Sequence, residues 1–321
     1  MSFKRLLPVL ALVASLAFVV AACGSDDNES GAATGGESSS EGLSGSIRID
    51  GSSTVLPFAE AAGELFNEEN PDVKITVGSS GTGGGFEKFC AGETDISDAS
   101  RPIKDDEEAP ICKKNGVGYQ EIQVANDGIA VVTNPNLKVD CLTVDQLKKV
   151  WEPKSKVGSL ADVESSLPDT KLALFGPGTD SGTFDFFTDE INGEEGASRE
   201  DYQASEDDNQ LVTGVEGSEG GLGYFGFSYY EQQQDRLNLV GVGESADSCV
   251  KPSKETIQDG SYTPLSRPLF MYPSDKALAR PEVKAFMDFT VENQQAIAEA
   301  SQIVPLTEEQ ASEAQTALGG N

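Results

Sequence analysis

The apolar residues of the N-terminal half are spaced in a way that predicts short strands alternating with amphipathic helices. Residues 46–50 and 73–77 are short runs in which β-branched residues recur, as they do in strands. Between them, residues 57–69 carry apolar side chains at helical spacing, and Pro57 suits the first turn of a helix. Because this alternation across short loops is typical of a parallel or mixed sheet covered by helices, the sequence predicts an α/β fold.

The rest of the chain continues the same pattern. Two apolar strands are expected at 119–124 and 128–133, on either side of Asn126-Asp127, and the second is near-continuously apolar, as a buried strand is. The motifs Thr143-x-x-Gln146 and Thr307-x-x-Gln310 are capping boxes, and each predicts a helix that begins there. Further strands are expected at 94–97, 171–175, 220–227, 237–242 and 267–272. Further helices are expected at 86–91, 105–115, 143–151, 184–191, 280–292 and 294–301.

Three segments combine Gly, Ser and Thr immediately before a helix-like run, at 51–54, 79–85 and 176–183. A helix N-terminus presents unpaired N–H groups and the positive end of the helix dipole. Glycines and hydroxyl residues leave these donors open and let a ligand approach the backbone closely. Each segment alone could be a simple helix cap. Because each follows a predicted strand, the three together predict one shared site for a small anion.

The first residues of the chain predict a secretory signal that ends in a lipidation site. A basic start at Lys4-Arg5 precedes the apolar stretch 6–20. The sequence Ala21-Ala22-Cys23 resembles a bacterial lipobox, which implies cleavage before Cys23 and lipidation of its thiol; a plain signal peptide is the alternative. Residues 23–45 are rich in Gly, Ser and acidic residues and predict a flexible tether. The expected location is the extracytoplasmic face of the cell membrane, with a lipid anchor.

The charge and the composition restrict the function further. The formal net charge is −31, which argues against nucleic-acid binding and against long-range steering of an anion, so an anion site must use local donors. Histidine is absent, which removes Ser-His-Asp catalysis and histidine metal sites. A phosphoester hydrolase that uses Ser or Thr is the enzyme alternative. We expect a binding protein that is not an enzyme and has no cofactor or metal.

Four motifs together resemble the phosphate-binding proteins of Pst-type ABC transporters, in their SphX-like branch. The resemblance implies two α/β lobes of the type II periplasmic-binding-protein fold, joined by a two-strand hinge, with phosphate buried between them. It also implies that the cleft closes on inorganic phosphate outside the cell and delivers it to an ABC permease. Order and spacing agree from about residue 46 to the C-terminus, and the motifs are Gly51–Pro57, Ser80–Phe86, Asp95–Ile103 and Gly176–Phe184.

The resemblance implies a discontinuous first lobe, with crossings near Asn126-Asp127 and Ser266-Arg267. The expected partners are inorganic phosphate, the permease subunits and the membrane through the lipid, and we expect a monomer. The alternatives are a protein that binds another tetrahedral oxyanion, such as sulfate or arsenate, and a phosphate sensor or adhesin without transport. The expected divisions are 1–22 for the signal, 23–45 for the tether, 46–126 with 267–321 for the first lobe, and 127–266 for the second.

Matching of the motifs assigns candidate phosphate donors on both lobes. Two positions depart from the better-known family pattern. Ser100 stands where that pattern has a proton-accepting Asp, and Pro177 stands where it has an Arg. We expect Arg101, beside Ser100, to supply the guanidinium, because its planar fork suits a bidentate oxyanion contact. The candidate donors by motif are Ser53 or Thr54, Ser80 or Thr82, and Ser181, Gly182 and Thr183.

The carboxylate that accepts the phosphate proton is left open by the sequence. Phosphate near neutral pH keeps a proton that sulfate lacks, so a buried acceptor would favour phosphate over sulfate. Asp127 is the first candidate because it adjoins an expected hinge strand. Asp180 and Asp98 follow.

Cysteine usage is consistent with an exported protein. There are five cysteines, and if Cys23 carries lipid the remaining four allow three disulfide connectivities. We favour Cys90–Cys112 with Cys141–Cys249, because each pair then lies within one expected lobe.

Overall fold

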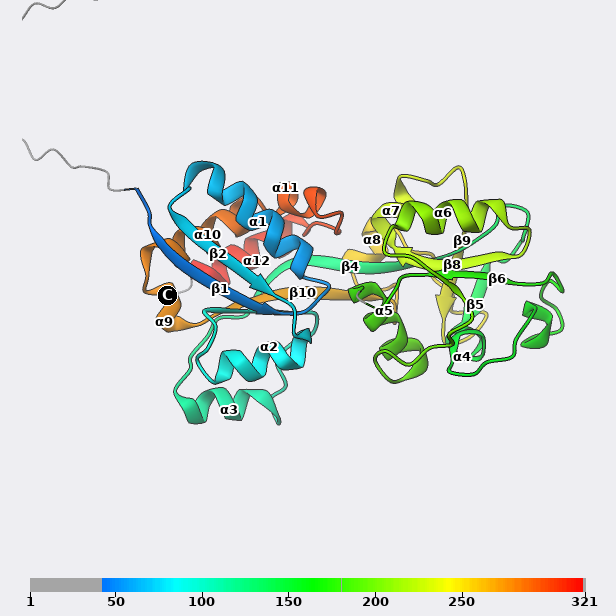
Figure 1. Ribbon diagram of the computed structural model, residues 1–321, viewed down its shortest axis with the longest axis horizontal. Coiled ribbons are helices and arrows are strands. Elements are labelled where there is room, and N and C mark those ends of the chain that lie inside the picture. Colours follow the sequence, from blue (N-terminus) through cyan, green and yellow to red (C-terminus); the bar gives the residue numbers. More distant parts are fainter. Residues whose placement is uncertain (1–41, 180, 320–321) are drawn as a thin grey trace, which may run out of the picture. The chain divides into compact units, whose positions relative to one another are not determined.

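The computed structural model describes residues 42–179 and 181–319. The expected signal, the lipidation site Cys23, the tether as far as residue 41 and the candidate acceptor Asp180 lie outside the described residues. Within the described ranges, no helix is long and apolar enough to cross a membrane. The described chain has an α/β fold built around a ten-stranded mixed sheet, which confirms the predicted fold class (Figure 1).

The first lobe contains strands β1 (Gly45–Gly51), β2 (Val73–Gly78) and β3 (Ile96–Ala99). Its helices are α1 (Leu56–Glu69), α2 (Gly81–Cys90), α3 (Glu108–Asn115), α9 (Asp275–Leu278), α10 (Pro281–Glu292), α11 (Gln294–Ala300) and α12 (Glu308–Gly319). Strand β1 pairs in parallel with β2 and β3. Helices α1, α10, α11 and α12 lie on one face of this sheet, and α2 and α3 lie on the other (Figure 1). The sheet therefore carries a hydrophobic core on each face.

The second lobe is built around a separate hydrophobic core. Its strands are β5 (Cys141–Thr143), β6 (Ala173–Gly176), β7 (Gln203–Ala204), β8 (Gly221–Gly226) and β9 (Asn238–Gly243). Its helices are α4 (Val144–Trp151), η1 (Leu160–Asp162), α5 (Gly182–Phe187), η2 (Thr188–Asn192), α6 (Asp208–Gly217), α7 (Phe227–Glu231) and α8 (Lys254–Gln258). At its centre, Trp151 packs edge-on against Tyr224 with ring centroids 4.9 Å apart.

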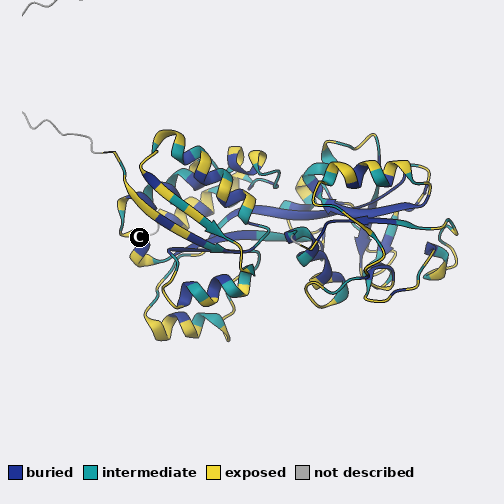
Figure 2. Cartoon of the chain, viewed as in Figure 1, coloured by how far each residue is buried: buried dark blue, intermediate teal, exposed yellow. Residues whose placement is uncertain are grey.

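Two long antiparallel strands, β4 (Ile122–Thr133) and β10 (Ser266–Pro273), belong to both lobes. Residues 122–125 of β4 pack in the first core and residues 129–132 in the second. Both strands are largely buried (Figure 2). The expectation of two strands around Asn126-Asp127 is wrong, because β4 is continuous. The polar pair fits inside it because the Asn126 backbone bonds to Val304 and the Asp127 carboxylate pairs with Arg267.

The glycine-rich segment 79–85 is not a turn that precedes the helix. Helix α2 begins at Gly81, so all the glycines of this segment lie in its first turns. A Cβ at Gly85 would lie 2.5 Å from the Gly51 Cα, whereas one at Gly83 would meet nothing within 4 Å. Gly85 therefore lets α2 pack directly on the end of β1, which is a tertiary reason for a glycine inside a helix.

Two further expectations differ from the structure in the second lobe. The helix expected at 184–191 is divided: α5 ends at Phe187 and a π-helix, η2, continues to Asn192. The acidic residues 194–208 were expected to form a loop or weak helix, and no helix was expected after them. Helix α6 begins at the last of these residues and continues to Gly217, and Asp207 caps it by accepting a bond from the Asn209 N–H. Asp207 stands among many other acidic residues, so the sequence pattern did not single it out as a helix cap.

The described residues form two disulfides, and they are the pairs favoured from the sequence. Cys90–Cys112 joins α2 to α3 in the first lobe. Cys141–Cys249 joins β5 to the segment after β9 in the second lobe. Each bridge therefore closes a loop within one lobe, and neither crosses the cleft.

Candidate functional site

A cavity of about 500 Å³ lies between the two lobes. The first lobe contributes the ends of β1 and β2, the start of α2 and the loop after β3. The second lobe contributes α5, η2 and the residue Glu195, and the shared strand β10 contributes Arg267 and Pro268. The lining residues from the first lobe are Ser52, Ser53, Thr54, Ser80, Gly81, Thr82, Gly83, Gly84, Ser100, Arg101 and Pro102.

Two helix N-termini open into this cavity. The chain leaves β1 at Gly51 and turns through Ser52 to Thr54 into α1, with the Ser52 N–H bonded to the Asp98 carbonyl at 3.0 Å. In the described part of the chain, the backbone N–H groups of Ser53 and Thr54 have no hydrogen-bond partner. Helix α2 begins at Gly81, and its first N–H groups have no intrahelical acceptor. The first two Gly/Ser/Thr segments therefore bring unpaired donors to one place.

Arg267 supplies the cationic group at the back of the cavity. Its Nε donates to the Asp127 Oδ2 at 3.4 Å, and one terminal nitrogen donates to the Thr54 Oγ1 at 2.5 Å. The guanidinium lies 3.6 Å from the centroid of the Phe186 ring, and the side chain is 16% exposed. Burial lowers the Arg267 pKa, although the Asp127 carboxylate opposes that effect. The group still carries its charge at neutral pH, because the pKa of an arginine is far above 7.

The sequence interpretation did not identify Arg267 as a site residue. It placed Arg267 only near the point where the chain was expected to return from the second lobe to the first. The available signal was a charged residue at the start of an otherwise apolar strand, at a point where the chain was expected to pass the cleft.

Arg101 also lines the cavity, but its guanidinium already has an acidic partner. It donates two hydrogen bonds to the Glu108 carboxylate, at 2.6 and 3.0 Å, and one to the Pro102 carbonyl at 3.1 Å. Hydrogen bonding to Glu108 raises the Arg101 pKa. The Arg101 N–H groups that could bind an oxyanion are thus already bonded to Glu108 and Pro102 within the first lobe.

Several hydroxyls named from the sequence lie at the cavity and are bonded to one another or to Asp50. The Ser80 N–H and hydroxyl both donate to the Asp50 carboxylate, which also accepts from Lys88. The Thr82 and Ser100 hydroxyls are 3.0 Å apart, and the Ser100 N–H donates to Thr82. These contacts fix the orientation of the start of α2 and the loop after β3.

The third Gly/Ser/Thr segment contacts the first one directly. The Gly182 carbonyl accepts from the Thr54 hydroxyl at 3.2 Å, and a Cβ at Gly182 would lie 2.5 Å from the Thr54 nitrogen. Ser181 caps α5 by accepting from the Thr183 N–H at 3.2 Å. Ser181, Gly182 and Thr183 adjoin the cavity without lining it. The close approach at Gly182 requires a residue without a side chain.

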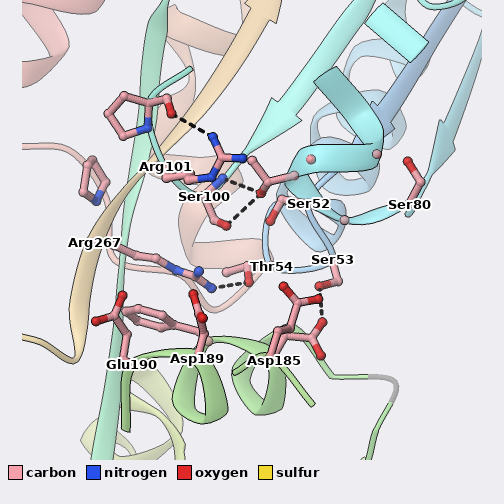
Figure 3. A pocket seen from close by; sticks show the side chains of 18 residues that line it. Ser52, Ser53, Thr54, Ser80, Ser100, Arg101, Asp185, Asp189, Glu190 and Arg267 are labelled. Atoms are coloured by element: carbon pink, nitrogen blue, oxygen red, sulfur yellow. Dashed lines mark hydrogen bonds between the residues drawn. The ribbon is translucent and has the colours of Figure 1, made fainter. Parts of the chain in front are cut away.

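The wall that the second lobe presents is acidic. Figure 3 shows Asp185, Asp189 and Glu190 facing Arg267, Thr54 and Ser53 across the cavity. The Asp185 Oδ2 accepts from the Ser53 hydroxyl at 3.1 Å. Burial raises the Asp185 pKa, and Ser53 and Arg267 lower it by less. Burial and neighbouring carboxylates also raise the pKa values of Glu190 and Glu195. None of these four acidic residues was singled out from the sequence.

The two acceptor candidates that the structure describes, Asp127 and Asp98, do not line the cavity. Asp127 is paired with Arg267 and does not line the cavity. Asp98 is fully buried in β3, and neither of its carboxylate oxygens has a hydrogen-bond partner in the described chain. Burial raises the Asp98 pKa well above its usual range, and the nearby Asp50 adds to this effect. Within residues 42–179 and 181–319, no group of three or more acidic, Cys or His residues is placed to hold a metal ion.

Comparisons with known proteins find matches over most of the chain. Residues 36–294 match the PBP superfamily domain. The chain is 43% identical to the protein SphX of Synechococcus elongatus, over 81% of this chain and 77% of that protein. It is 41% identical to the phosphate-binding protein PstS of Staphylococcus epidermidis, over 88% of this chain and 83% of that protein.

Solved structures of phosphate-binding proteins are also similar to this chain. A crystal structure of a possible phosphate-binding protein from Planctomyces limnophilus superposes with a TM-score of 0.82 at 45% identity, over 86% of this chain and 98% of that one. A putative phosphate ABC transporter substrate-binding protein from Clostridium perfringens, solved with bound phosphate, gives a TM-score of 0.56 at 28% identity, over 82% of this chain and all of that one (100%).

Proposed function

Because the chain belongs to the SphX/PstS family of phosphate-binding proteins, we infer that it binds inorganic phosphate as the substrate-binding protein of a Pst-type ABC transporter. It is a binding protein rather than an enzyme, and its family implies permease subunits as partners. The observation that carries the assignment is the convergence of two helix N-termini and the Arg267 guanidinium on one cavity between the lobes.

We propose that phosphate oxygens accept hydrogen bonds from the N–H groups of Ser53 and Thr54, from the start of α2 and from Arg267. Neutral N–H donors at helix ends suit an anion because the helix dipole adds a positive potential there. Arg267 adds a full charge on a side chain that is only 16% exposed, and an ion pair formed by a buried charge is stronger than one at the surface. Arg101 is proposed as a secondary contact, because Glu108 already neutralises it.

We also propose that the lobes close on phosphate about strands β4 and β10. The Ser53–Asp185 and Thr54–Gly182 hydrogen bonds join the first lobe to α5 across the cavity. A ligand bonded to both lobes binds the closed form best and so shifts the population towards it. The permease can then distinguish the loaded protein by its shape.

Lipid anchoring at Cys23 is a further proposal, supported by the lipobox-like sequence before it. A lipid on Cys23 and the tether after it would hold the protein at the extracytoplasmic face of the membrane, close to the permease. Metabolic labelling with a tagged fatty acid should mark the native protein. A Cys23→Ala variant should carry no label and appear in the medium or periplasm.

Calorimetry with inorganic phosphate tests the binding assignment. Arg267→Ala should weaken phosphate by about 2–5 kcal/mol, the usual cost of truncating one partner of a buried charge pair. Arg236→Ala is the matched control, since Arg236 pairs with Glu216 away from the cavity and the variant should bind as the parent does. Absence of phosphate binding by the parent protein would contradict the assignment, and unchanged binding by Arg267→Ala would remove Arg267 from the site.

A further inference from the structure

A short segment between α11 and α12, residues 302–307, connects the two lobes outside the shared strands. Val304 is 2% exposed and packs in the core of the second lobe, whereas Leu306, two residues later, packs in the core of the first. The backbone of Val304 also pairs with Asn126 on β4 through two hydrogen bonds, at 2.8 and 3.1 Å. The segment is therefore a third connection between the lobes, in addition to β4 and β10.

Side-chain amides strengthen this connection. Gln258, the last residue of α8 in the second lobe, donates from its Nε2 to the Pro305 carbonyl at 2.8 Å. Gln310 of α12, in the first lobe, donates from its Nε2 to the Gln258 carbonyl at 3.0 Å. The Gln310 Oε1 accepts from the Asn126 Nδ2 at 3.1 Å, which ties both to β4. We call Asn126, Gln258, Pro305 and Gln310 the hinge clasp.

The hinge clasp is separate from the cavity but is formed at the same time as the contacts across it. None of its four residues lines the cavity. Helix α8 contacts both β4 and β10, and Figure 1 shows it at the side of the second lobe that faces the first. In the same arrangement of the lobes, Ser53 bonds to Asp185 and Thr54 bonds to Gly182 across the cavity.

The clasp bonds depend on how the lobes are oriented. Rotation of one lobe against the other about β4 and β10 has to move α8 relative to Pro305 and Gln310. A hydrogen bond is lost when its heavy atoms separate beyond about 3.5 Å, so the clasp tolerates little rotation. It therefore favours the arrangement in which the lobes also touch across the cavity. A ligand that contacts both lobes binds with an apparent affinity that scales with the fraction of molecules in that arrangement.

We propose that the hinge clasp biases the lobes towards the closed arrangement and thereby raises the phosphate affinity of a cavity that it does not touch. The proposal rests on the proposed phosphate-binding function and identifies residues outside the cavity that regulate it. Gln258 and Gln310 are positioning residues, because they act on the ligand only through the orientation of the lobes.

A Gln258→Ala variant tests the effect on affinity. It removes the bond to Pro305 from a half-buried side chain and leaves the Gln258 backbone carbonyl in place. Calorimetry with inorganic phosphate should show an affinity about three- to tenfold weaker than that of the parent, as expected for one lost hydrogen bond. The matched control is Gln234→Ala, which removes a bond of the same kind, to the Glu231 carbonyl at 3.0 Å within the second lobe, and should bind as the parent does. Unchanged or tighter binding by Gln258→Ala would overturn the proposal.

The orientation of the lobes is measured directly by electron paramagnetic resonance. Spin labels are introduced at the exposed positions Lys113 and Lys149, one on each lobe, through an unnatural amino acid. Without phosphate, Gln258→Ala should have a smaller fraction of molecules at the distance seen with saturating phosphate, and with phosphate it should match the parent. A general loss of stability would leave that fraction unchanged.

Equal fractions in the unliganded parent and Gln258→Ala would overturn the proposal. Absence of phosphate binding by the parent would instead contradict the phosphate assignment. The unliganded distance distributions of the parent and the variant would then still show whether the clasp biases the lobes.

Discussion

Asp98 is a carboxylate enclosed in the first lobe without a hydrogen-bond partner in the described chain. Its pKa is raised because burial disfavours the charged form. A raised pKa means that the folded state holds the proton more tightly than the unfolded state. The contribution of Asp98 to stability is therefore most favourable below the ordinary carboxyl pKa and is lost as the pH rises through the raised value.

Asp98→Asn should accordingly stabilise the protein at neutral pH. The amide cannot ionise, so the free energy of unfolding should rise by about 1–3 kcal/mol at pH 7, and the gain should disappear at acidic pH. Urea unfolding at the two pH values measures this. Asp169→Asn, at an exposed position, is the control and should show no such pH-dependent gain. Equal effects of Asp98→Asn at both pH values would contradict the raised pKa.

Arg101 and Arg267 both line the cavity, but their surroundings predict unequal contributions. Arg101 is about one-third exposed and bonded to Glu108 in its own lobe. Arg101→Ala should therefore weaken phosphate by about 1 kcal/mol or less, as for a partly exposed ion pair. Parallel phosphate titrations of Arg101→Ala and Arg267→Ala compare the two, and a larger loss at Arg101 would show that it leaves Glu108 for the ligand.

At the scale of elements, the contact between α2 and the end of β1 positions the N–H groups that we propose bind phosphate. Gly85→Ala should destabilise the protein by about 1–3 kcal/mol, because its Cβ would overlap the Gly51 backbone and push the two elements apart. Gly83→Ala in the same helix meets open space and should instead stabilise the helix by up to about 1 kcal/mol. Thermal unfolding without phosphate gives both values. Equal effects would mean that the packing of α2 on β1 does not require Gly85.

For the molecule as a whole, the net charge of −31 should oppose the approach of an anion. Salt screens this repulsion, since the Debye length falls from about 30 Å to about 8 Å between about 0.01 M and about 0.15 M ionic strength. The association rate of phosphate should therefore rise several-fold over that range. Stopped-flow fluorescence on a labelled protein measures it. A rate that falls with added chloride would indicate local attraction at the cleft that outweighs the net charge.

The sequence by itself determined the α/β class, most of the elements and the three segments that end near one cavity. These features depend on the spacing of apolar residues, on helix caps and on the positions of glycines, and all three can be recognised within a few consecutive residues. The capping box at Thr143 and Gln146 forms as expected. The family motifs are likewise short runs of consecutive residues, so they could be read without a structure.

Only the tertiary structure decided which charged groups surround the cavity. Arg267 reaches Thr54 across 213 residues, and Asp185 reaches Ser53 across 132. The tertiary structure also gave Arg101 a partner within its own lobe and placed Gly85 of α2 against the end of β1. The physical reason is that charge pairing and close packing depend on distance in space, and folding alone brings these distant segments within hydrogen-bonding distance.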